Sequence, residues 1–106
     1  MEFELKPGES VVARHWARMY RGGGWTGWRG RLTVTDQRLL FEARVLGHGT
    51  SEEILMSRIA SVTLENSLGL IPNRVRVVRQ DGSVIDFITF GRRQIVETIE
   101  WVRDAG

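Results

Sequence analysis

Arginine and aromatic side chains are concentrated in one part of this sequence. Between Glu9 and Asp36 there is no acidic residue, and the segment carries Arg14, Arg18, Arg21, Arg29 and Arg31 together with Trp16, Tyr20, Trp25 and Trp28. Guanidinium groups bind phosphate and carboxylate through paired hydrogen bonds, and tryptophan is favoured in the headgroup zone of membranes. Because like charges this close repel one another unless an anion is near, the segment predicts a site for an anionic group.

The residues needed for catalysis or metal binding are not placed together. The chain has no cysteine, and its two histidines, His15 and His48, lie far apart with no acidic residue at ligand spacing. We expect His15 to be a hydrogen-bonded core residue and His48 to be a solvated loop residue. No nucleophile with a base is evident, so the sequence predicts no enzyme, no cofactor and no metal site.

Length and composition predict one domain over residues 1–106. The net charge of +2 is modest, which argues against nucleic acid as the partner, although fourteen of the fifteen basic residues are arginine. The absence of cysteine, of a signal-like N-terminus and of an apolar run of ~20 residues predicts a soluble, cytoplasmic protein. Any contact with a membrane would then be peripheral.

Alternating apolar residues predict that the arginines lie on β-strands. In the segment Ser10 to Tyr20 the odd positions are mostly apolar and should face inward, which turns Arg14, Trp16 and Arg18 outward. After a lead-in over residues 1–9, we expect strands at 10–20, 28–35, 38–45, 53–57, 59–64, 73–79 and 83–90, with a loop at 46–51. Arg29 and Arg31 fall on the outward face of the second strand, so two neighbouring strands present arginines on the same side.

The C-terminal segment changes to helical spacing. Ile95, Ile99 and Val102 form one apolar stripe and predict an amphipathic helix over residues 92–104, with Phe90 and Ile95 packed together at its start. We also expect the apolar loop Leu68, Leu70 and Ile71 to fold back and plug one end of the barrel. If exposed instead, it would be a membrane-inserting or peptide-binding tip.

The order of elements and several short motifs resemble the GRAM domains and bacterial PH-like domains of the pleckstrin-homology superfold. The resemblance lies in Gly8-Glu9, in Gly30-Arg-Leu-Thr-Val-Thr-Asp-Gln-Arg-Leu-Leu-Phe41, in the pair Ile59 and Val62, and in the Asp81-Gly82 turn before the terminal helix. It implies a mainly β (α+β) split barrel of about seven antiparallel strands over residues 10–90, capped by the helix. It also implies a non-enzymatic binding module, without specifying a ligand.

Two functions remain open. In PH domains that bind phosphoinositides, a basic residue ends the first strand and a basic-x-Arg pair opens the second; Arg21 and Arg29-Gly-Arg31 match that spacing, with support from Arg14, Arg18, Trp25 and Trp28. An anionic membrane surface would be the partner. Alternatively, the arginines pair with Glu42, Glu52 or Glu53, Trp28 joins the core and Trp25 covers the barrel mouth. That arrangement would be an ordinary solvated face. A separate hypothesis is a module that binds a protein, or forms a homo-oligomer, through Trp16, Tyr20 and Trp101.

Overall fold

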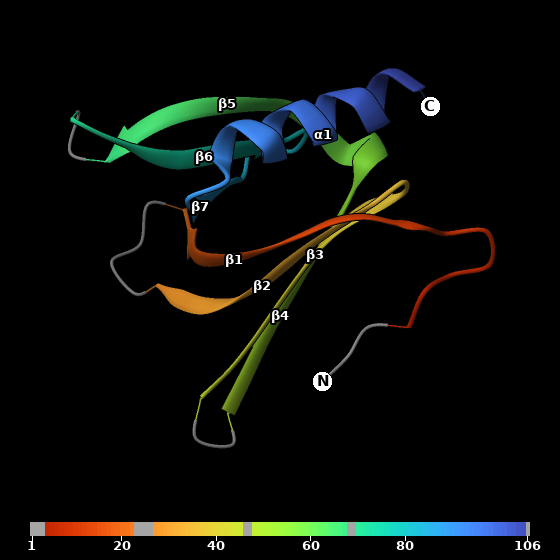
Figure 1. Ribbon diagram of the computed structural model, residues 1–106, viewed down its shortest axis with the longest axis horizontal. Helices are drawn as coiled ribbons and strands as arrows, with labels where there is room; N and C mark the ends of the chain where they lie inside the picture. Colours follow the sequence, from red (N-terminus) through yellow and green to blue (C-terminus); the bar gives the residue numbers. More distant parts are fainter. Residues whose placement is uncertain (1–3, 23–26, 46–47, 68–69, 106) are drawn as a thin grey trace.

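The computed structural model describes residues 4–22, 27–45, 48–67 and 70–105, which form one curled antiparallel sheet and a C-terminal helix (Figure 1). The strand order is β4-β3-β2-β1-β7-β6-β5. The elements are β1 (Val11–Arg21), β2 (Trp28–Thr35), β3 (Arg38–Val45), β4 (His48–Leu55), the 3-10 turn η1 (Met56–Arg58), β5 (Ile59–Ser67), β6 (Ile71–Arg79), β7 (Val84–Ile88) and α1 (Arg92–Ala105). The predicted split barrel of seven strands capped by one helix is therefore confirmed.

The core lies on the inner face of the sheet, to which every strand contributes buried apolar side chains. In β1 the alternation places Ala17 and Met19 inside and Arg14, Trp16 and Arg18 outside, as predicted. Phe41 of β3 and Phe87 of β7 pack against each other with ring centroids 5.8 Å apart and so join the two halves of the barrel. Such tilted aromatic pairs add to the stabilisation from burial alone.

The helix α1 closes one open side of the barrel with a single apolar stripe. Ile95, Val96, Ile99 and Val102 are buried, and each contributes about 2 kcal/mol through burial. Two arginines hold the helix along β5: Arg92 donates to the backbone oxygen of Glu65, and Arg103 donates to that of Ile59. None of the helices in the described ranges is long and apolar enough to cross a membrane.

Two details differ from the sequence predictions. The strand predicted at 53–57 begins at His48, because backbone pairing with β3 continues through the polar residues of the expected loop at 46–51. His15 is half-buried at the edge of the core, where its ring packs against Gly91, rather than inside the core. The side chain of His48 lies outside the described residues.

The expected apolar plug is wrong. Leu70 is 84% exposed and Ile71 is 50% exposed, so neither side chain fills an end of the barrel; Leu68 lies outside the described residues. Phe90 does not pack on Ile95 either, and its side chain is fully exposed. Leu70 and Ile71 stand at the start of β6, and Phe90 lies between β7 and α1.

A buried ion pair ties the N-terminal segment to the β2–β3 turn. Arg38 donates to both carboxylate oxygens of Glu9, at 2.7 and 2.8 Å, and also pairs with Glu53. The Thr35 hydroxyl donates to the same Glu9 carboxylate at 2.6 Å. The hydrogen bond from Arg38 has the largest effect, and against the opposing effect of burial these contacts lower the pKa of Glu9 to about 2.

Candidate functional site

The outer surface of β1, β2 and β3 carries a group of arginines with one exposed tryptophan. We call this surface the arginine face; its members are Arg14, Trp16 and Arg18 of β1, Arg29 and Arg31 of β2, and Arg44 of β3, and all are exposed. The strand register brings them together, since Trp16 lies opposite Arg31 and Arg18 lies opposite Arg29. Alternation therefore produces the cluster, because each member points away from the core.

The lining of the groove on this surface includes one acid, Glu42, which lies opposite Arg31 in the strand register. Within the part of the chain that the structure describes, none of the five arginines of the arginine face forms an ion pair. Arg18 and Arg29 are direct cross-strand neighbours, a like-charge arrangement that disfavours the sheet. The Arg31 guanidinium lies 5.3 Å from the ring centroid of Trp16, a contact that orients it without neutralising it. An anion bound here would relieve the repulsion.

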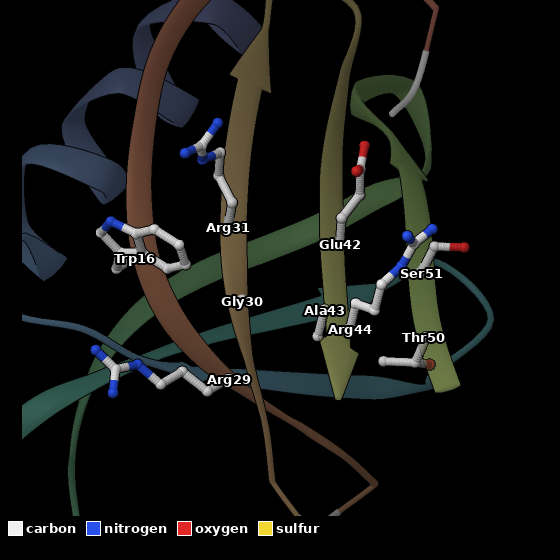
Figure 2. Close-up of a pocket in the computed structure, with 10 residues that line it drawn as sticks. Trp16, Arg29, Gly30, Arg31, Glu42, Ala43, Arg44, Thr50 and Ser51 are labelled. Carbon is white, nitrogen blue, oxygen red and sulfur yellow. The ribbon is translucent and has the colours of Figure 1, made fainter. Parts of the chain in front are cut away.

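A groove of about 600 Å³ runs across this surface (Figure 2). One side carries Trp16, Arg29 and Arg31, and the other carries Glu42, Arg44, Thr50 and Ser51. Its floor is Gly30, where β2 passes so close to β3 that a Cβ atom would lie 2.0 Å from the backbone oxygen of Glu42. Guanidinium and hydroxyl donors around an open groove suit a phosphate or carboxylate ligand.

Arg21 lies apart from Arg29 and Arg31, so the structure does not bring together the three arginines of the predicted motif. At the end of β1 it is 3.6 Å from the Glu52 carboxylate and donates to the Thr50 hydroxyl at 3.1 Å. Glu52 also pairs with Arg79. This matches the alternative in which an arginine of the motif is held by Glu52, and it makes Arg21 a cross-link between β1 and β4.

Arg21 lines a second cavity, of about 500 Å³, in which arginines and acids are matched. Its acids are Glu52, which pairs with Arg21 and Arg79, and Asp86, which is almost fully buried. Asp86 accepts hydrogen bonds from Arg74 at 2.8 Å and Arg76 at 3.0 Å. Burial raises the pKa of Asp86, but the hydrogen bonds from Arg76 and Arg74 outweigh it and hold the pKa below its usual value. An additional anion would be bound less favourably in this cavity than on the arginine face, because the arginines of the cavity already pair with acids.

The predicted aromatic residues occupy three kinds of environment. Trp28 is half-buried and packs against the core, and Tyr20 is half-buried with the Arg74 guanidinium 5.5 Å from its ring centroid. Trp16 and Trp101 are exposed by 63% and 64%. Trp25 lies outside the described residues. The surfaces predicted to meet a partner thus retain Trp16 and Trp101, while Tyr20 is partly covered.

Some residues of the site were not predicted from the sequence. Arg44 has the outward parity of the predicted strand 38–45, so it could have been found by extending the pattern used for Arg29 and Arg31. Thr50 and Ser51 were assigned to a loop, because residues 48–53 lack apolar alternation. Among the described residues, no group of three histidine or acidic side chains is placed to hold a metal ion.

Comparisons with known proteins support the fold and do not identify a ligand. The N-terminal PH domain of Vps36 superposes with a TM-score of 0.79 at 17% identity, over 96% of this chain and 84% of that one. The C-terminal domain of an unknown protein from Leishmania infantum superposes with a TM-score of 0.74, also at 17% identity, over 92% and 86% of the two chains. No protein-family model and no curated protein matches the sequence significantly. The chain has a PH-like fold.

Proposed function

We propose that this protein is a non-enzymatic module that binds anionic, phosphate-bearing lipid headgroups at a membrane surface through the arginine face. The observation that carries the proposal is the absence of any ion pair for Arg14, Arg18, Arg29, Arg31 and Arg44 in the described part of the chain. Other arginines of this protein do find acids: Arg21, Arg38, Arg74, Arg76 and Arg79. Charge that the fold leaves unmatched on one face is available for a ligand.

The expected strength of such binding follows from the number of charges. A basic side chain near an anionic bilayer contributes about 1 kcal/mol, so five arginines give roughly 5 kcal/mol before orientation costs. That corresponds to weak, reversible binding that salt should screen. Trp16 would sit at headgroup level beside Arg31, where an amphipathic ring is favoured. The proposal includes two inferences from the sequence, namely that the protein is a GRAM domain and that it is cytoplasmic.

Vesicle co-sedimentation tests the proposal. The wild-type protein should pellet with vesicles that contain phosphatidylserine and not with pure phosphatidylcholine, at physiological salt. The double variant Arg29→Glu/Arg31→Glu should stay in the supernatant, because it reverses two charges and adds two acids to the groove. Arg58→Glu is the matched control, since Arg58 is exposed on η1 and remote from the face. Equal pelleting of the double variant and the wild type would overturn the proposal.

A second candidate function, peptide binding, is favoured by the incomplete pairing of β1. Its ladder with β2 begins at Val11, but its ladder with β7 covers only Arg18 to Arg21. The unpaired edge lies beside a groove of about 450 Å³ that is lined by Val12, Ala13, His15, Gln94, Glu97, Thr98 and Trp101. An extended peptide could add to this edge and contact Trp101 of α1. This surface is separate from the groove at Gly30.

A further inference from the structure

Apart from the tryptophans, the two most exposed large apolar side chains of the described residues are Phe90, between β7 and α1, and Leu70, just before β6; Leu5 and Val12 are exposed elsewhere. Phe90 has a relative exposure of 108%, Leu70 of 84% and Ile71 of 50%. We call these three residues the apolar tip. Aliphatic and phenyl groups gain nothing from such exposure in water, and grouped exposure of this kind marks contact with a membrane or a protein.

One backbone hydrogen bond places the chain before Phe90 beside the chain that follows Leu70 and Ile71. The Thr89 N–H donates to the backbone oxygen of Asn73 at 3.0 Å, so Phe90 follows a residue that is paired with β6. Leu70 and Ile71 precede Asn73 by three and two residues, which is at most roughly 10 Å of extended chain. The start of β6 and the start of α1 both lie at the left of Figure 1, whereas η1 lies toward the right.

The same residue, Thr89, links the apolar tip to the arginine face. Its hydroxyl donates to the backbone oxygen of Trp16 at 2.9 Å, which fixes Phe90 next to the β1 segment that carries Trp16. Arg18 lies opposite Ile88, two residues before Phe90. Phe90 therefore directly follows a residue that is bonded to β1 at Trp16, the strand that also carries Arg14 and Arg18.

The charges around the tip select a membrane as its partner. Arg93 is exposed in the first turn of α1, forms no ion pair within the described ranges, and lies at the helix end where the dipole disfavours a cation. Arg18 is the register partner of Ile88, two residues before Phe90, so Arg18 and Arg93 are the unpaired cations of the described residues that lie closest to Phe90 along the paired chain. This combination matches an anionic bilayer, whose phosphates meet the arginines while its acyl region takes up the apolar groups.

We infer that Phe90, Leu70 and Ile71 insert into the acyl region of an anionic bilayer while the arginine face contacts the headgroups. This inference rests on the proposed function and adds an apolar, salt-resistant part to the binding. It also defines an orientation, with the starts of β6 and α1 toward the membrane and η1 away from it.

The absence of cysteine allows a direct test of insertion. Phe90→Cys and, as control, Arg58→Cys would each be labelled with an environment-sensitive fluorophore and mixed with phosphatidylserine-containing vesicles. The label at position 90 should shift to the blue and be quenched by spin-labelled acyl chains, and the label at 58 should not change. In the unlabelled protein, Phe90→Ser should weaken partitioning about tenfold, since much of a phenyl ring's burial is lost.

The outcomes separate this inference from the proposed function. If the wild-type protein pellets with anionic vesicles, but the label at 90 is unaffected and Phe90→Ser binds normally, the arginine face stands and insertion is refuted. If the wild-type protein does not pellet at all, both are refuted. A blue shift that depends on protein concentration without vesicles would assign the tip to self-association and overturn the membrane assignment.

Discussion

Replacing Glu9 with glutamine should destabilise the fold by about 3 kcal/mol at neutral pH. The Glu9 carboxylate is buried and accepts hydrogen bonds from Arg38, Thr35 and the backbone of Lys6. Its pKa of about 2, against an ordinary value of 4.5, is a shift of about 2.5 units, equivalent to about 3 kcal/mol. Removing one partner of a buried ion pair has a similar cost. For 106 residues this corresponds to a fall in Tm of about 13 °C.

The stabilisation from Glu9 should decrease as the pH falls. Because folding lowers the Glu9 pKa, the stabilisation is complete above the unfolded-state pKa, falls to about 1.5 kcal/mol at pH 3 and is lost below about pH 2. Urea unfolding of the wild type and Glu9→Gln at pH 7 and pH 3 should therefore show a difference that shrinks with acid. Glu100→Gln, on the exposed face of α1, is the control and should change little. A difference that is the same at both pH values would refute the reasoning.

Two further predictions concern the groove floor and the β1 edge. Gly30→Ala should destabilise the protein by about 3 kcal/mol or more in urea unfolding, because its Cβ would meet the Glu42 backbone oxygen at 2.0 Å. In the control Gly49→Ala the Cβ would lie 3.4 Å from the Ala43 oxygen, so the cost should be less than about 1 kcal/mol. Similar costs for the two variants would contradict the close approach of β2 to β3 at Gly30. Adding a short peptide that alternates lysine and valine should slow hydrogen exchange of the Arg14 amide in the wild-type protein, and it should have no such effect in Trp101→Ser. An unchanged exchange rate in the wild type would refute peptide binding at the β1 edge.

The fold was predictable from the sequence because its strands alternate and its helix has one stripe. The bounds 28–35 and 38–45 agree with β2 and β3, whose apolar residues repeat at every second position. Residues 48–53 have no such pattern, and their strand is formed by backbone pairing with β3, which side-chain type does not reveal. The exposure of Leu70 and Phe90 was missed for a related reason, since apolar character was taken to mean burial.

The candidate site was only partly predictable, because position on a strand does not specify which acid lies within reach. Arg29 and Arg31 were placed correctly by alternation. Arg21 fitted a sequence spacing, yet the fold brings Glu52 of β4 to it across the sheet. The motif residues Glu9 and Arg38, which contributed to the PH-like resemblance, proved to be a buried structural pair that holds the N-terminal segment on the β2–β3 turn.

The distribution of arginines on the folded protein argues that the arginine face is more than an ordinary solvated surface. Five arginines pair with acids, and Arg92 and Arg103 donate to backbone oxygens of β5. Of the arginines without either kind of partner among the described residues, only Arg58 and Arg93 lie off the face, and Arg93 adjoins the apolar tip. Unpaired charge thus gathers beside exposed apolar groups. A solvated surface requires no such association, whereas cations beside exposed apolar groups suit the surface of an anionic bilayer.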